Sequence, residues 1–343
     1  MVSVDTAIAH LAGSMGRRGM VLLPFSPDWR WGLEGPDNDW YGSLTLLRQN
    51  RPGEWDEIVT SVVQTLKTMA PAQTATPRRS NTGRTPAKRV CVLSYNNVGN
   101  FGDRLGYHLI HQVLPPDAIV RHCHFRPWDV PEDEAFDLVV LGIGNSLFGP
   151  LLEPRLERLL ERAKASIGIF GTQYRKELPR ARLDAVLDRL DLWHARYRDD
   201  IELFGGGRAN IRHLGDWLIG AFPMAEGTRD EVLRIGPEVT RELPLDRLIQ
   251  QIQAHRRVVS TRLHPLLCAL TSAEQVAYEE QREMGAAAGE SGKFGSMLRD
   301  VFGRSFPESQ LWSVDRAAVA AYKATIKANM AKLEADIARL LQA

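Results

Sequence analysis

The sequence predicts an α/β protein with parallel sheets and helices on both of their faces. From residue 89 onward, short apolar segments rich in β-branched residues alternate with segments whose apolar residues recur at helical spacing. Of the 343 residues, 44% are hydrophobic and 25% are charged, which suits a globular chain with a buried core. This length allows two domains or one large two-lobed unit.

Charge and cysteine content narrow the class of protein. The 43 Lys and Arg residues nearly balance the 42 Asp and Glu residues, so a nucleic-acid partner is not expected. Cys91, Cys123 and Cys268 have no metal-like spacing and are expected to be buried thiols in a reducing compartment. His122, Cys123 and His124 share one predicted strand, where at most the two histidines point to the same side, so no metal site is predicted.

Targeting signals are not expected either. The N-terminus lacks the basic segment of a signal peptide, and Asp5 and His10 interrupt its apolar run. No apolar run approaches the roughly 18 residues that span a bilayer. We therefore expect a soluble cytoplasmic protein without a transmembrane segment.

The first 70 residues predict a helix–strand–helix fragment. The helix VDTAIAHLAGSMG is expected to start at Ser3 or Asp5 and to end near Gly16. MVLLPF is then a strand, and GEWDEIVTSVVQTLKTM is an amphipathic helix. Residues 71–88 are basic and rich in Pro, Thr and Ser, without an acidic residue, and they predict a disordered or extended linker.

Residues 89–343 predict the main body. Strands are expected in RVCVLSY, AIVRHCHF, DLVVLGIG, SIGIFGT, LDLWHARY and RRVVST, and helices over 103–113, 151–164, 180–191, 244–255 and 263–271. DLWHARYRDD is interpreted as a strand that ends in a solvated, charged turn. The Ala-rich segment from Val314 to Leu341 predicts a long C-terminal helix that packs across the body.

A polar, Gly-rich stretch follows the first strand of the body. In NNVGNFGDRLGYHLI, residues 96–110, Gly99 and Gly102 allow a ligand to approach the backbone, and Asp103 stands at the expected N-cap of the next helix. Open parallel sheets bind ligands beyond the carboxyl ends of their strands. A structural turn with a capping Asp fits the pattern about as well as a ligand site.

Two further junctions carry polar residues. LGIGNSLFGP, residues 141–150, is Gly-rich but departs from the G-x-G-x-x-G spacing, so a dinucleotide site is not predicted. In VVSTRLHPLLCAL, a strand ends at Ser260, and Arg262 and His264 follow in the expected first helical turn. Arg offers a planar fork for phosphate or carboxylate, His titrates near neutrality, and helix N-termini favour anions. The third junction therefore predicts an anion site.

These segments together resemble the polysaccharide pyruvyl transferase family. They are NFGDRL after one strand, GIGNSLFG after another, and VVSTRLHPLLCAL followed by Tyr278 and KFGSMLRDVFG. HLGD, residues 213–216, fits a Gly-Asp element of that family, and the resemblance runs from about residue 89 to about residue 303. It implies a GT-B-like fold in which two Rossmann-like lobes face a cleft, with the second lobe starting at about residue 205.

The resemblance also implies an activity. The family transfers the pyruvyl group of phosphoenolpyruvate to sugar hydroxyls of a cell-surface polysaccharide or its lipid-linked precursor, forming a pyruvate ketal. Phosphoenolpyruvate is then a donor substrate, and no resident cofactor is firmly implied. Peripheral contact with a membrane-bound glycan precursor is compatible with this activity. The sequence does not predict the acceptor sugar or the oligomeric state.

Site residues follow from the matched motifs. Arg262 and His264 would hold the phosphate or carboxylate of the donor, and Lys293 would add a further positive charge. His264 is the expected acid that protonates the donor, and Asp103 the expected base or charge stabiliser. The remaining residues expected to bind substrate are Asn100, Gly102, Gly144, Asn145 and Ser260.

Two features keep alternatives in view. TSAEQVAYEEQREMG replaces the Gly-x-Pro turn that the family carries after its Arg-x-His helix, and QVAYEEQRE is acidic for a segment beside an anion site. The head resembles part of the nucleotide-sugar lobe of heptosyltransferase-like glycosyltransferases, where Asp5, Thr6 and His10 would contact the donor diphosphate. The alternatives are therefore a nucleotide-sugar-dependent glycosyltransferase and a noncatalytic glycan-binding relative.

Overall fold

The computed structural model describes most of the chain as two units. The described residues are 1–24, 31, 36, 41–49, 55–69, 87–96, 100–143, 146–236, 245–280 and 291–342. Contacts divide the chain into a head, Met1–Arg84, and a body, Thr85–Ala343, each of which is considered by itself. The predicted linker lies almost wholly outside the described residues, as do Gly144 and Asn145.

The head is a small parallel sheet with two helices. Its elements are β1 (Val2–Val4), α1 (Ala7–Ser14), β2 (Gly19–Leu23), β3 (Leu44–Arg48) and α2 (Asp56–Met69), with the strands in the order β1-β2-β3. The prediction missed β1 and β3. Residues 2–4 were expected near the start of the helix, but α1 begins only after its N-cap Thr6, and the short Val-Ser-Val segment before it pairs with β2.

Six parallel strands form the sheet of the first lobe of the body. Their order is β11-β10-β8-β6-β4-β5, and every adjacent pair is parallel. The strands are β4 (Arg89–Asn96), β5 (Ile119–Arg126), β6 (Leu138–Leu141), β8 (Ser166–Gly168), β10 (Leu192–Ala195) and β11 (Ile211–His213). The connecting helices are α3 (Phe101–Val113), α4 (Pro154–Arg162), α5 (Arg180–Arg189) and α6 (Arg198–Phe204). Apolar clusters pack on both faces, as the α/β prediction requires.

The strand order reverses at β4. The chain passes from β4 outward to β5 and then returns to β6 on the other side of β4. Open sheets bind ligands at such a switch point, outside the carboxyl ends of the two strands. Here α3 leaves the end of β4 and packs close to the segment after β6, because a Cβ on Gly106 would lie 2.8 Å from the carbonyl oxygen of Ile143.

A four-stranded sheet forms the second lobe. Its order is β12-β13-β14-β15, in which the first three strands are parallel and β15 is antiparallel. The elements are β12 (Arg229–Ile235), α8 (Leu245–Gln253), β13 (His255–Ser260), α9 (Leu263–Ala269), β14 (Gln275–Tyr278), α10 (Lys293–Phe302) and β15 (Trp312–Ser313). The lobe was expected to start at about residue 205. That boundary is corrected, because β11 pairs with β10 in the first sheet and β12 is the first strand of the second.

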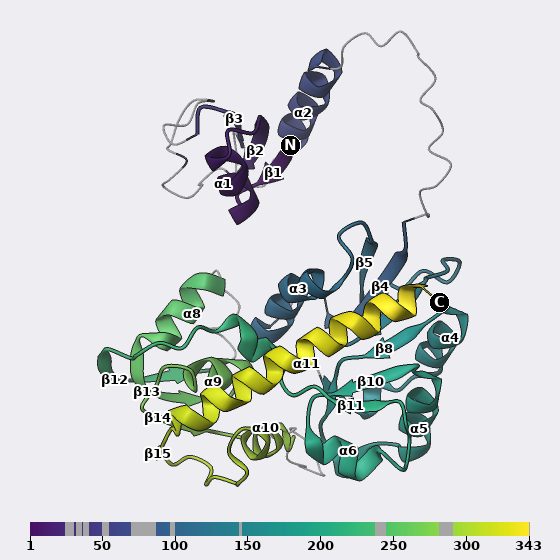
Figure 1. Ribbon diagram of the computed structural model, residues 1–343, viewed down its shortest axis with the longest axis vertical. Helices are drawn as coiled ribbons and strands as arrows, with labels where there is room; N and C mark the ends of the chain where they lie inside the picture. The colour runs from purple at the N-terminus through teal and green to yellow at the C-terminus, as the bar shows by residue number, and fades with distance from the viewer. Residues whose placement is uncertain are drawn as a thin grey trace. The chain divides into compact units, whose positions relative to one another are not determined.

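The C-terminal helix α11 (Arg316–Gln342) runs across both lobes in Figure 1. Asp315 caps it by accepting hydrogen bonds from the N–H groups of Ala317 and Ala318. It contacts α3, α10 and the 3-10 helix η4 (Trp217–Ala221). Its buried residues recur every three or four positions, as the predicted amphipathic packing requires, and include Val319, Tyr322, Ile326, Leu333, Ile337 and Leu340.

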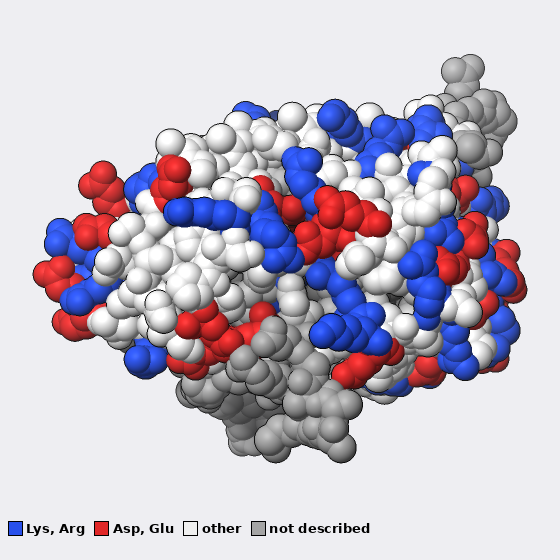
Figure 2. Space-filling model, turned by 90° about the horizontal axis from the view of Figure 1, so that it is seen from below, with Lys and Arg blue, Asp and Glu red and all other residues white. Residues whose placement is uncertain are grey.

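Two surface properties of the described residues bear on partners. Basic and acidic side chains are interspersed over the face shown in Figure 2, in keeping with a net charge of +1. Within the described ranges, no helix has both the length and the apolar character needed to cross a membrane.

Candidate functional site

The first part of the site is the start of α3, at the carboxyl end of β4. Asn100 is the N-cap, and its side-chain oxygen accepts hydrogen bonds from the N–H groups of Gly102 (3.0 Å) and Asp103 (3.2 Å). Asp103 was predicted to be the N-cap, and that prediction is wrong. Asn is an equally good cap and stands three residues earlier, so Asp103 falls in the first helical turn, where it is only 1% exposed.

The second part is the junction between β13 and α9. The hydroxyl of Ser260 accepts a hydrogen bond from the N–H of Arg262 (3.0 Å) and donates one to the carbonyl oxygen of Arg262 (2.8 Å). This local turn uses the hydroxyl of Ser260 to fix the backbone. Arg262 is the N-cap of α9, one position before the predicted first turn, and His264 lies inside the helix.

The two parts meet in direct contact. A Cβ added to Gly102 would lie 1.8 Å from Nδ1 of His264, so only glycine fits beside the imidazole. His264 is 7% exposed. The sequence placed these residues on facing lobes, and the structure brings them together, but at this point the lobes touch where a cleft was expected.

Asp216 lies on the opposite edge of the imidazole. Its Oδ2 is 3.4 Å from Nε2 of His264 and 3.8 Å from Nε of Arg196. Asp216 is fully buried, and its backbone N–H donates to the hydroxyl of Tyr322 on α11 (2.7 Å). Burial by itself would raise the pKa of Asp216, but Arg196 and His264 outweigh it and hold the pKa below its usual range. Asp216 is therefore an anion that lies between the Arg196 guanidinium and the His264 imidazole.

Asp103 is a second buried carboxyl with a different environment. Neither of its oxygens has a hydrogen-bond partner among the described residues. Burial raises the pKa of Asp103, although His264, Arg196 and Lys293 oppose this effect. A buried polar group without a partner is costly and calls for an explanation, of which a missing ligand is one.

Lys293 completes the charged group at the first position of α10. Burial and the neighbouring Arg262 guanidinium lower the pKa of Lys293 to about 8, against the opposing effect of Glu280. The Arg262 and Lys293 side chains therefore act on each other electrostatically. We call Asp103, Arg196, Asp216, Arg262, His264 and Lys293 the switch-point cluster.

Sequence reasoning missed Arg196 and Asp216. Arg196 directly follows β10, and only 3% of it is exposed. The interpretation of DLWHARYRDD as a solvated charged turn is wrong, because Arg196 and Asp200 are both buried in the body. A usable signal was present: in a parallel sheet, a charged residue that follows an apolar strand joins the other strand ends. Asp216 stood in the HLGD element, after a Gly215 with φ +83° that brings it inward.

A second set of buried and partly buried polar residues joins the two lobes and comes from segments far apart in the sequence. It comprises Thr172, Arg175, Asp199, Asp200 and Ser296, and we call it the Arg175 network. Asp200 accepts from Thr172 Oγ1 (2.5 Å), Thr172 N (2.9 Å) and Arg175 Nε (2.9 Å). Arg175 Nη1 donates to Ser296 on α10 (2.8 Å), which donates to Asp199 (2.6 Å).

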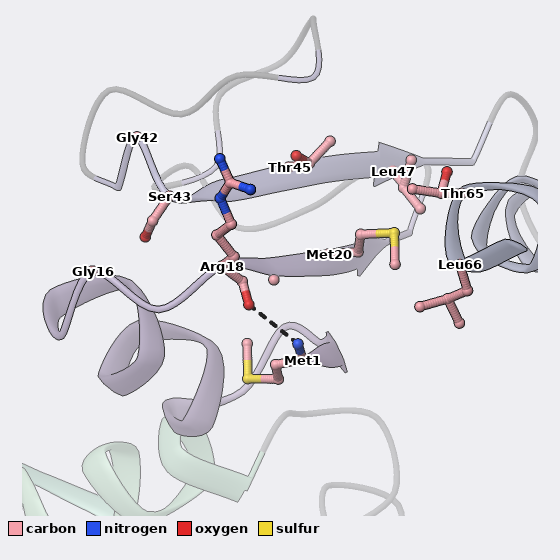
Figure 3. A pocket seen from close by; sticks show the side chains of 11 residues that line it. Met1, Gly16, Arg18, Met20, Gly42, Ser43, Thr45, Leu47, Thr65 and Leu66 are labelled. Atoms are coloured by element: carbon pink, nitrogen blue, oxygen red, sulfur yellow. Dashed lines mark hydrogen bonds between the residues drawn. The ribbon is translucent and has the colours of Figure 1, made fainter. Parts of the chain in front are cut away.

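The residues singled out in the head contact one another. His10 stacks on Trp31 with ring centroids 4.6 Å apart, and its Nδ1 is 3.2 Å from the Tyr41 hydroxyl. Asp5 lies 3.8 Å from Nε2 of His10. A separate cavity of about 700 Å³ lies over β2, β3 and α2 (Figure 3), and its lining includes Arg18, Met20, Ser43, Thr45, Leu47 and Leu66. Asp5, Thr6 and His10 do not line it, so the predicted diphosphate contacts and this cavity are different places.

Comparison with known proteins adds no assignment. No protein-family model matches the chain, and no curated protein matches it. Within the described part of the chain, no three His, Cys, Asp or Glu side chains are grouped to hold a metal ion. The functional argument therefore depends on the geometry and charge of the switch-point cluster.

Proposed function

We propose that this chain transfers the pyruvyl group of phosphoenolpyruvate to two hydroxyls of a sugar in a polysaccharide or its lipid-linked precursor. Four basic side chains support this proposal: Arg196, Arg262, His264 and Lys293 gather where the carboxyl ends of two sheets meet. Such a set suits a donor that carries both a phosphate and a carboxylate. The proposal includes a GT-B-like arrangement, and it requires the lobes to separate where Gly102 and His264 touch, so that the acceptor can reach Asp103.

Asp103 beside His264 is the observation that carries the proposal. The carboxyl is buried and lacks a hydrogen-bond partner among the described residues, and its pKa is raised. A group of this kind can take a proton from a sugar hydroxyl once the substrate supplies the missing hydrogen bond. A purely structural Asp at this depth would be expected to have its hydrogen bonds satisfied.

The proposed reaction starts with proton transfer to the methylene carbon of phosphoenolpyruvate. His264 is the donor. Asp216 lies 3.4 Å from its Nε2 and Gly102 packs against its Nδ1, so the two lobes must separate here before the methylene carbon can reach the ring. Protonation makes the central carbon electrophilic, and one sugar hydroxyl adds to it while giving its proton to Asp103. The carbon–oxygen bond to phosphate then breaks, and the second hydroxyl closes the ketal and returns a proton to the His264 imidazole. The proton held by Asp103 leaves with the phosphate. Arg262 and Lys293 stabilise the departing phosphate.

A single assay tests the proposal. The chain is incubated with candidate oligosaccharides and either phosphoenolpyruvate or nucleotide sugars, and phosphate release and product mass are followed together. The proposal predicts phosphate release with phosphoenolpyruvate only, and a product heavier by one pyruvyl ketal. Transfer from a nucleotide sugar would instead identify a glycosyltransferase, and inactivity with binding of the glycan would identify a noncatalytic relative. Either result would overturn the proposal.

A further inference from the structure

A small polar cavity lies where α11 crosses the edge of the first sheet. It measures about 160 Å³ and is lined by His194, Arg212, His213, Asn329 and Lys332. His194 and Arg212 are direct partners in the β10–β11 pairing, and Asn329 and Lys332 come from α11 (Figure 1). All five lining residues are polar, and none of them belongs to the switch-point cluster. A cavity of this size holds about five waters, or one tetrahedral oxyanion with some water.

Two buried carboxylates fix the histidines of the cavity. Asp336 on α11 lies 3.1 Å from Nε2 of His194, and Asp300 on α10 lies 2.9 Å from Nε2 of His213. Burial lowers the pKa of His194 despite Asp336, so this imidazole is neutral near pH 7. These pairs hold the walls of the cavity in place, and the charge that they bring is that of the Asp300 and Asp336 carboxylates.

Basic side chains outnumber the acids around this cavity. Asp336 also contacts Nε of Arg212 (3.2 Å) and Nη2 of Arg339 (3.3 Å). Asp300 also contacts Nε of Arg198 at 3.9 Å. Together with Lys332, these make four cationic side chains against two carboxylates, with the two imidazoles left out of the count. The local field therefore favours an anion.

Asn329 and Arg212 give the cavity a defined geometry. The Asn329 amide donates to the carbonyl oxygen of Leu214 (3.2 Å), which fixes α11 against the segment after β11. Arg212 meets Asp336 through Nε, and its guanidinium carries further N–H groups on the same plane. Lys332 reaches the same cavity from the helix, so two cations on different elements line one space.

We propose that this cavity binds one small tetrahedral oxyanion of the size of phosphate or sulfate, held by Arg212 and Lys332. The anion would connect the β10–β11 edge to α11, the helix that crosses both lobes. A ligand that binds only the folded protein stabilises it by an amount that grows with the ratio of ligand concentration to Kd, so the anion would stabilise the packing of α11. The inference does not depend on the proposed pyruvyl transfer.

Phosphate titration of the full chain tests this site. Because the switch-point cluster is also basic, the titration uses the Arg262→Gln variant, in which that cluster is weakened. Inorganic phosphate is added at constant ionic strength, with chloride replacing it in the control, and heat of binding and Tm are followed. The site predicts saturable binding with a rise in Tm that chloride does not reproduce.

Variants of the lining residues locate the binding. Lys332→Gln, an exposed change that leaves the fold intact, should weaken phosphate binding roughly 10-fold, because one charge-assisted hydrogen bond is lost. Arg212→Gln should weaken it at least as much, and Arg212→Lys less than Arg212→Gln. The matched control Lys327→Gln changes another exposed lysine of α11 and should have no effect. Equal binding by the Lys332→Gln and Lys327→Gln proteins, or no saturable binding at all, would overturn the inference.

Discussion

Two sets of charged side chains join the lobes of the body: the Arg175 network and the switch-point cluster. They differ in the number of hydrogen bonds that their buried carboxylates accept. In the Arg175 network, the Asp200 carboxylate accepts three hydrogen bonds, and the chain of contacts continues through Ser296 to the second lobe. In the switch-point cluster, Asp103 accepts none from the described residues, and the contacts of Asp216 with its cations are 3.4 and 3.8 Å. Burial raises the pKa of Asp103 and of Asp200 alike.

The Arg175 network and the switch-point cluster therefore differ in how fully their buried carboxylates are hydrogen-bonded, and not in how deeply these carboxylates are buried. A satisfied buried network fixes a structure, whereas a partly satisfied one is costly unless something else completes it. Both groups connect the first sheet to helices of the second lobe. We infer that the Arg175 network holds the lobes together and that the switch-point cluster retains its unmet hydrogen-bonding capacity for a substrate.

The largest effect is expected from His264→Ala. Loss of the proton donor should lower phosphate release from phosphoenolpyruvate by about 10²- to 10⁴-fold, the usual contribution of general acid catalysis. The control His111→Ala changes an exposed histidine of α3 and should leave the rate unchanged. Normal turnover by the His264→Ala protein would refute the assignment of the acid.

Arg175→Met should cost the most stability. It leaves the buried Asp200 carboxylate without its cation, and breaking a buried pair in this way typically destabilises by about 3–5 kcal/mol. Chemical denaturation measures the change. Arg158→Met, at an exposed arginine of α4, serves as the control and should change the unfolding free energy by less than about 1 kcal/mol. Equal effects of the two substitutions would contradict a structural role for the network.

Gly102→Ala should damage activity more than stability. The new Cβ would lie 1.8 Å from Nδ1 of His264, so the imidazole must move, and misplacement of this kind costs up to about 100-fold in rate. Gly220→Ala is the matched control, because nothing lies within 4 Å of its added Cβ. If Gly102→Ala kept full activity with phosphoenolpyruvate, His264 would have no defined position in the reaction.

The affinity for phosphoenolpyruvate should depend on pH through Lys293. The pKa of Lys293 is lowered to about 8, so in the free protein its ammonium group loses its proton as the pH rises through that value. Binding should therefore weaken between pH 7 and pH 9 in the natural chain. Lys293→Arg keeps its charge over this range and should show a flatter profile in a titration with phosphoenolpyruvate.

Asp103→Asn is expected to give the smallest change in stability, and one with a specific dependence on pH. At pH values below the usual range of an Asp, the carboxyl is protonated in both the folded and the unfolded chain, and no stability is lost. As the pH rises through the raised pKa, ionisation favours the unfolded chain, and the natural protein loses stability that the Asn variant keeps. The variant should thus be more stable at pH 8, with a smaller gain at pH 5, while its phosphate release falls. A variant that was less stable at pH 8 would show that Asp103 is structurally satisfied.

The parallel α/β body could be predicted from the sequence because short apolar runs indicate buried strands, whereas apolar residues at every third or fourth position indicate helices. The two patterns alternate along the body. Sequence reasoning located β4, α3, β13 and α9 within a few residues and hence predicted that Gly102 and His264 face each other, but it predicted an open gap between them where the structure has direct contact. It missed β1 and β3 in the head, since segments of three to five residues carry too little periodicity. It misplaced the start of the second lobe because a three-residue strand, β11, gives no sign of which sheet it joins.

The burial of charged side chains could not be predicted from the sequence. This applies to Arg196, Asp216 and the residues of the Arg175 network. Their side chains come from segments that look solvated in sequence, because charged residues are usually exposed. Burial of these residues depends on partners that are far away in the chain, such as Ser296 for Arg175 and Tyr322 for Asp216. Only the three-dimensional arrangement reveals such pairs. The sequence could therefore predict where a site lies but not the full set of charges in it.

Calorimetric titration of phosphoenolpyruvate into the natural chain, without any acceptor, tests the central claim most directly, since it requires no knowledge of the sugar. We expect one molecule bound per chain, with affinity at least about 10-fold lower in Arg262→Gln, which loses charge-assisted hydrogen bonds, and unchanged in Lys327→Gln. No binding, or equal binding by both variants, would contradict the assignment of the switch-point cluster as the donor site.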